Sequence, residues 1–127
     1  MTITSIMITD INGSELVTFA QQTASQLVNA SLTRSQIRGI FTEVRKLEAI
    51  WESRPIEAQR RLNMLKPKLD YQAARIPAVK TLKDVLTQAI DEVNKAPSDE
   101  ERNRRFRVFM DLFEAILAYH RAQGGRS

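Results

Sequence analysis

The chain has 127 residues, of which 43% are hydrophobic, so it is expected to form one globular domain with a modest core. It has no cysteine and one histidine. Disulfides and thiolate zinc sites are therefore excluded, and we expect no metal and no other cofactor. The N-terminus lacks a basic segment followed by an apolar one, and no apolar run approaches roughly 18 residues. We therefore expect a cytoplasmic protein with no membrane partner.

Charge is distributed unevenly along the chain. Residues 1–33 contain two acidic residues and no Lys or Arg, whereas residues 34–127 contain all 19 basic residues against 13 acidic ones. The formal net charge is +4. A basic balance of this kind favours a nucleic-acid partner, although a merely solvated basic face has the same composition.

The pattern of apolar residues predicts an all-α fold, a single compact bundle of about five helices. Residues 1–13 are rich in Thr and Ile and are interpreted as a flexible N-terminal arm, or as a strand added to a neighbour, ahead of a helical domain over 14–127. The first predicted helix covers about 14–29. Thr33 and Gln36 form a capping box for the second, whose apolar residues recur at helical spacing as far as Trp51.

Proline and a second capping box delimit the remaining predicted helices. The third begins near Pro55 and is expected to be interrupted at Lys66-Pro67, because proline disfavours a helical conformation for the residue before it. The fourth follows Pro77. Ser98 and Glu101 form the second capping box and begin the last helix, which ends at Gly124 and Gly125.

Three groups of basic residues are candidates for binding phosphates. Arg34, Arg38 and Arg45 share one side of the second helix, where arginine can contact phosphate in a bidentate manner; a solvated face is about equally compatible with the spacing. In the third helix, Lys66, Lys68 and Arg75 accompany Tyr71. Tyr71 could stack on a base, but a packed ring with a solvated hydroxyl is the favoured interpretation.

The third group lies at the start of the last helix, where Arg102, Arg104, Arg105 and Arg107 follow three acidic residues. Local salt bridges explain some of these arginines, while Arg105 and Arg107 could reach an anion. His120 falls on the apolar side of the same helix and is interpreted as a packed residue with one satisfied nitrogen. No nucleophile elbow, phosphate-binding glycine loop or carboxylate pair in a concave site is evident, so we expect no catalytic residues and no enzyme.

Three short segments, in order, resemble a known family. They are residues 32–38, residues 65–71 with Arg75, and residues 109–120. Together they resemble the small subunit of the type III-A CRISPR–Cas effector complex, the Csm complex, over roughly residues 32–125. The resemblance implies a small helical protein without enzymatic activity. It also implies contact with the crRNA–target RNA duplex through backbone phosphates, with the backbone and large subunits, and with further copies of itself.

Two other functions remain as alternatives. A helix-turn-helix-type DNA-binding protein would need a recognition helix that exposes base-reading side chains, and the second predicted helix is too long and too apolar for that role. A protein-only helical adaptor would dock through apolar faces, and its partner affinity would not depend linearly on salt as phosphate binding does.

Overall fold

The computed structural model describes residues 2–126, and this part of the chain contains helices and no strand. The elements in order are α1 (Ile3–Ile8), α2 (Ser14–Asn29), α3 (Arg34–Ile50), α4 (Pro55–Arg75), a short 3-10 turn η1 (Pro77–Val79), α5 (Lys80–Asn94) and α6 (Asp99–Ala122). The prediction of a compact all-α bundle is confirmed. None of the described helices is long and apolar enough to cross a membrane.

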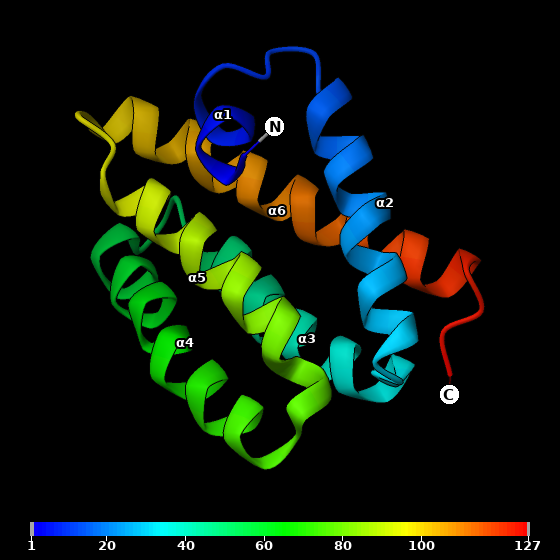
Figure 1. Ribbon diagram of the computed structural model, residues 1–127. Helices are drawn as coiled ribbons and strands as arrows, with labels where there is room; N and C mark the ends of the chain where they lie inside the picture. The colour runs from blue at the N-terminus through cyan, green and yellow to red at the C-terminus, as the bar shows by residue number, and fades with distance from the viewer. Residues whose placement is uncertain (1, 127) are drawn as a thin grey trace.

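The long helix α6 is the centre of the bundle. It packs against α1, α2, α3 and α5, while α4 packs on the other side of α3 and α5 (Figure 1). The aromatic residues of α6 carry much of this packing. Phe109 and Phe113 are fully buried, and the rings of Phe113 and Phe41 from α3 form a T-shaped pair with 5.1 Å between centroids. Edge-to-face pairs of this kind add to the free energy of burial.

The N-terminal residues differ from the expected flexible arm. Residues 3–8 form α1, which is capped by Thr2 and buries Ile3, Ile6 and Met7 against α5 and α6. Arg104 of α6 donates a hydrogen bond of 2.7 Å to the carbonyl of Met7. The reason is local: the apolar residues of MTITSIMITD recur at positions 3, 6 and 7, which is helical spacing, and the segment is only one strand long.

The expected interruption at Pro67 is wrong, because α4 runs without a break from Pro55 to Arg75. Leu62, Leu65 and Leu69 are buried on either side of Pro67, which is itself exposed. Packing of this apolar face offsets the loss of one backbone hydrogen bond, so proline is tolerated inside the helix. Lys66 and Lys68 are therefore mid-helix residues and do not lie at a loop-to-helix junction.

The two predicted capping residues are confirmed, with one difference. Thr33 accepts from the backbone of Gln36, and the Gln36 side chain accepts from the backbone of Thr33, so this capping box is complete. Ser98 caps α6 by accepting from the backbone of Glu101. The Glu101 carboxylate does not return the bond, because it is held by Arg104 and Arg105.

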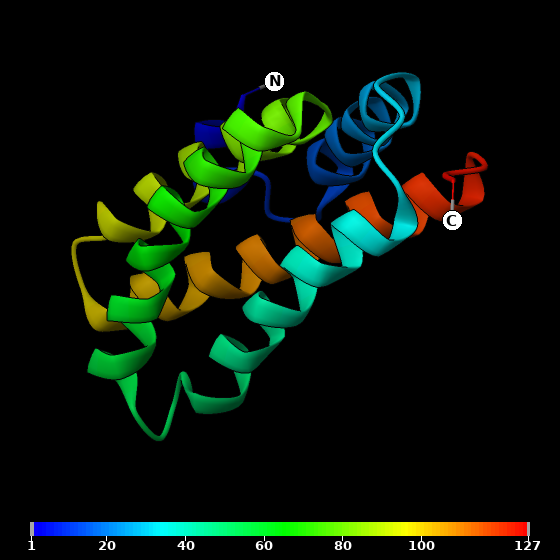
Figure 2. The same ribbon diagram turned by 90° about the horizontal axis from the view of Figure 1, so that it is seen from below.

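The helices α3 and α4 form an antiparallel pair that matters for function. They are joined by the connection 51–54, lie closest near it and diverge away from it (Figure 2). The N-terminal half of α3 and the C-terminal half of α4 therefore lie together at the end far from the connection. We call this the open half of the α3–α4 pair.

Candidate nucleic-acid interface

The open half of the α3–α4 pair carries four of the predicted basic residues that have no ion-pair partner within residues 2–126. They are Arg34 and Arg38 from α3, and Lys68 and Arg75 from α4. Arg38, Lys68 and Arg75 are exposed, and Arg34 is half-buried. The Arg75 guanidinium lies over the Tyr71 ring at 5.6 Å, which holds it near the helix surface.

The half nearest the connection 51–54 has a different electrostatic character, because four of its cations are paired with carboxylates. Arg45 pairs with Glu114 of α6 at 3.3 Å and with Glu48 at 3.6 Å. The other three pairs each lie within one helix: Lys46 with Glu43, Arg54 with Glu57, and Arg61 with Glu57. Exposed pairs like these contribute little stability, but they lower the positive potential that a phosphate would meet.

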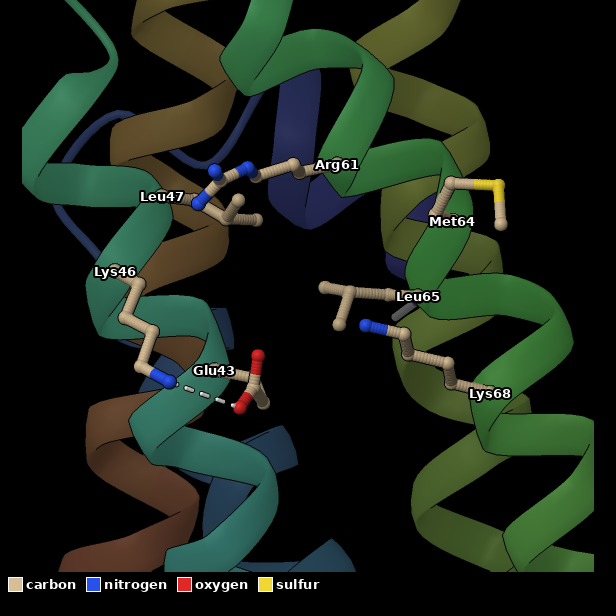
Figure 3. A pocket seen from close by; sticks show the side chains of 7 residues that line it. All are labelled: Glu43, Lys46, Leu47, Arg61, Met64, Leu65 and Lys68. Carbon is tan, nitrogen blue, oxygen red and sulfur yellow. Dashed lines mark hydrogen bonds and ion pairs between the residues drawn. The ribbon is translucent and has the colours of Figure 1, made fainter.

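A small groove between α3 and α4 connects the two halves. Glu43, Lys46 and Leu47 line it from α3, and Arg61, Met64, Leu65 and Lys68 line it from α4. Figure 3 shows the Arg61 and Lys68 side chains pointing from α4 towards α3, and Lys46 held by Glu43. Of the three cations in this groove, Lys68 alone forms no ion pair within residues 2–126. Lys68 is therefore positioned to meet an anion that approaches α3.

Three predicted site residues are already used within the fold. Arg45 makes the ion pairs described above, and Lys66 points away from the groove, towards α5, where it pairs with Asp91 at 2.6 Å. Arg105 is 7% exposed, donating to the Glu101 carboxylate and to the carbonyl of Glu92, each at 2.8 Å. Its guanidinium supports the junction of α5 and α6 and is not on the surface, so we leave it out of the interface.

The first turns of α6 confirm the predicted local salt bridges. Arg102 pairs with Asp99, and Arg104 and Arg105 both bind Glu101. Hydrogen bonds from Arg104 and then Arg105 lower the pKa of Glu101 from 4.5 to about 2, because both donors stabilise the ionised carboxylate. Within residues 2–126, Arg107 is therefore the one of these four arginines that is exposed and forms no ion pair.

Arg107 lies apart from the open half. It lines a wider pocket whose apolar floor is formed by Trp51, Phe106 and Met110 and whose rim includes Glu48 and Glu52. The rings of Trp51 and Phe106 stack at 3.7 Å, and the Trp51 indole donates to Asn103 at 2.8 Å. The structure therefore separates Arg107 from the arginines of α3, and the sequence pattern does not show this.

Two aromatic predictions have opposite outcomes. Tyr71 is 63% exposed, so the favoured interpretation of a packed ring is wrong. Tyr71 lies on the same side of α4 as the exposed Met64, opposite the buried leucines. His120 is fully buried, and its Nε2 lies 2.7 Å from the carbonyl oxygen of Leu32, so the packed histidine with one satisfied nitrogen is confirmed.

The described residues hold no cluster of three or more His, Cys, Asp or Glu side chains that could bind a metal ion. The open half offers three guanidinium groups and one ammonium group, two cations on each helix. Such groups bind phosphate by charge and hydrogen bonding, and they do not discriminate between bases.

The comparison with protein families gives one match. The model of the family described as Csm2 Type III-A matches residues 10–126. This range includes α2 to α6 and leaves out α1. No curated protein and no solved structure matches the chain.

Proposed function

Because the chain belongs to the Csm2 family of type III-A CRISPR–Cas systems, a family of structural small subunits, we propose that it binds the crRNA–target RNA duplex through the open half of α3 and α4. Arg34, Arg38, Lys68 and Arg75 contact backbone phosphates in this proposal. The subunit acts without catalysis, in the cytoplasm, as part of the effector complex.

The observation that carries the proposal is the distribution of partners around the basic residues. Near the connection 51–54, four cations (Arg45, Lys46, Arg54 and Arg61) are held by Glu43, Glu48, Glu57 and Glu114. In the open half, Arg34, Arg38, Lys68 and Arg75 have no carboxylate partner in residues 2–126. A cation without a carboxylate partner gains charge attraction and hydrogen bonds when a phosphate binds beside it. The same contacts release counterions from the RNA, which supplies affinity.

The chemistry of these side chains predicts binding without sequence preference. Phosphate contacts fix the position and orientation of a nucleic acid, and they carry no base information. In an RNA-guided complex the guide supplies sequence recognition by base pairing. A helical subunit that contacts only the backbone is therefore compatible with any guide.

Contact with the backbone and large subunits, and with further copies of the same chain, is the second part of the proposal. Exposed apolar side chains support it: Ile11 is 97% exposed in the connection between α1 and α2, and Ile56 is 72% exposed at the start of α4. The buried centre of a protein interface is more apolar than the rest of the protein surface.

The proposal is tested by the affinity of the full chain for a labelled guide–target RNA duplex across a range of salt concentrations. Wild-type affinity should fall linearly with salt on a double logarithmic scale. Arg60→Ala is a matched control, since Arg60 is an exposed arginine on the other half of α4 with no ion pair in the described chain. Absence of duplex binding, or equal loss from Arg60→Ala and Arg38→Ala, would contradict the proposal.

A further inference from the structure

The C-terminal residues lie against the N-terminal end of α3, at the edge of the open half. Beyond α6, the backbone N–H of Gly125 donates to the carbonyl of His120 at 2.9 Å. The carbonyl of Arg126 then accepts a hydrogen bond from the backbone N–H of Arg34. The tail is thus bonded to the first residue of α3, which is also a proposed phosphate contact.

A second contact joins the same two segments from within the core. His120, at the end of α6, bonds through Nε2 to the carbonyl of Leu32, two residues before Arg34. This carbonyl can only accept, so Nε2 carries the proton, and the imidazole is oriented by the bond. His120 and Leu32 are both fully buried, which makes the bond costly to lose because it would leave a buried carbonyl unsatisfied.

Gly125 permits this arrangement because it has no side chain. A Cβ at this position would overlap the His120 ring at Cε1 and Nδ1. The tail is also tied to α2, where Gln123 accepts from Ser25 at 2.8 Å and donates to the carbonyl of Gln21 at 3.2 Å. We call the set His120, Gly125 and the Arg126 carbonyl the C-terminal clasp.

We propose that the C-terminal clasp positions Arg34 for RNA binding, with His120 and Gly125 as positioning residues that do not contact RNA themselves. Arg34 is half-buried, and its Nε is shielded from solvent without a hydrogen-bond partner in the described chain. The inner part of the Arg34 side chain is therefore enclosed by the protein, and the clasp holds the backbone from which it extends. This inference rests on the proposed function of the open half.

The physical reason is preorganisation. An arginine that is already oriented loses less side-chain entropy when it binds a phosphate than one at a freely moving helix end. Without the clasp, α3 would retain the Thr33 cap, but Arg34 would lose its bond to the Arg126 carbonyl and Leu32 would lose its bond to His120. The Arg34 contact would then be weakened, while Arg38, one turn further along, would be less affected.

Four variants of the full chain test the inference. His120→Leu removes the bond to Leu32 but keeps an apolar side chain, and Gly125→Ala places a methyl group against the ring. His120→Gln keeps an N–H donor near the position of Nε2. Gly39→Ala is the matched glycine control, since a Cβ there meets nothing within 4 Å. Circular dichroism and thermal unfolding establish that each variant is folded.

The measurements are duplex affinity across salt concentrations and hydrogen exchange of the Arg34 amide. We expect His120→Leu and Gly125→Ala to speed hydrogen exchange at the Arg34 amide. They should also flatten the slope of log affinity against log salt, by no more than the value of about 0.7 to 0.9 expected for one phosphate contact. His120→Gln and Gly39→Ala should stay close to wild type. The losses should vanish in an Arg34→Ala background, because residues that act through Arg34 are not additive with its removal.

Each outcome decides between the two proposals. If the clasp variants lower affinity equally with and without Arg34, or if Arg34 exchange is unchanged, the clasp does not act through Arg34 and the inference fails. If Arg34→Ala has no effect while Arg38→Ala and Lys68→Ala do, the inference fails and the proposed interface stands. If none of the three substitutions changes affinity, the proposed interface fails and the inference fails with it.

Discussion

The start of α6 and the open half of the α3–α4 pair are both rich in basic residues, but they use them in opposite ways. At the start of α6, Arg102, Arg104 and Arg105 bind carboxylates within one turn and the backbone of neighbouring elements. In the open half, Arg34, Arg38, Lys68 and Arg75 form no ion pair within the described chain. The comparison teaches that the number of cations does not identify an interface, whereas the position of their partners does.

The interior side of α6 gives the largest expected effect. Phe113 is fully buried and meets Phe41 of α3, so Phe113→Ala should lower the free energy of unfolding by about 3 to 5 kcal/mol. Chemical denaturation of the full chain measures this. A loss below about 1 kcal/mol would mean that α3 is not anchored to α6 through this aromatic pair.

Arg105 tests whether the cations of α6 serve the fold. Arg105→Ala leaves the carbonyl of Glu92 without its donor and removes one partner of Glu101. The free energy of unfolding should therefore fall by about 2 to 3 kcal/mol. Duplex affinity of the folded protein should not change. Arg102→Ala is the control, because its partner Asp99 is 93% exposed, and we expect a loss of no more than about 1 kcal/mol.

Arg38 and Lys68 test the other side of the comparison. The double variant Arg38→Ala, Lys68→Ala should flatten the slope of log affinity against log salt by about 1.4 to 1.8, since two phosphate contacts are lost. The loss should be similar for duplexes of different sequence. The stability of the double variant should stay near that of the wild type, which serves as the internal control. An unchanged slope would mean that both residues lie on a merely solvated surface.

Acid should weaken the cluster at the start of α6 and not the open half. Arg104 and Arg105 lower the pKa of Glu101 to about 2, below its ordinary value of 4.5. A group whose pKa is lower in the folded state stabilises the fold above its unfolded pKa, and this stabilisation is lost as the pH falls from about 4.5 to about 2. Glu101→Gln should remove this part of the pH dependence. Thermal unfolding of the wild type and of Glu101→Gln at a series of pH values would show whether their stabilities converge in acid.

The smallest expected effect concerns the ion pair that joins α3 to α6 at the surface. Arg45 and Glu114 are about half exposed, so Arg45→Gln should lower stability by about 0.2 to 1 kcal/mol. A double-mutant cycle with Glu114→Gln isolates the pair. A coupling well above this range would show that Arg45 belongs to the scaffold and not only to its surface.

Residue spacing alone was sufficient to predict the bundle, the cap at Thr33 and the packed position of His120. These features depend on contacts between residues close in sequence, or on an apolar stripe that must face a core whatever its partner is. The short resemblance segments likewise pointed to the family that the match over residues 10–126 identifies.

The tertiary structure alone decided which cations are available. Arg45 lies on the same side of α3 as Arg38 but is bound by Glu114, which lies 69 residues away in sequence. Arg105 is buried because it binds the carbonyl of Glu92, which belongs to another helix. The continuity of α4 through Pro67 and the burial of α1 also depend on neighbouring helices. Helical periodicity specifies which side of a helix a residue occupies; only packing specifies what it meets there.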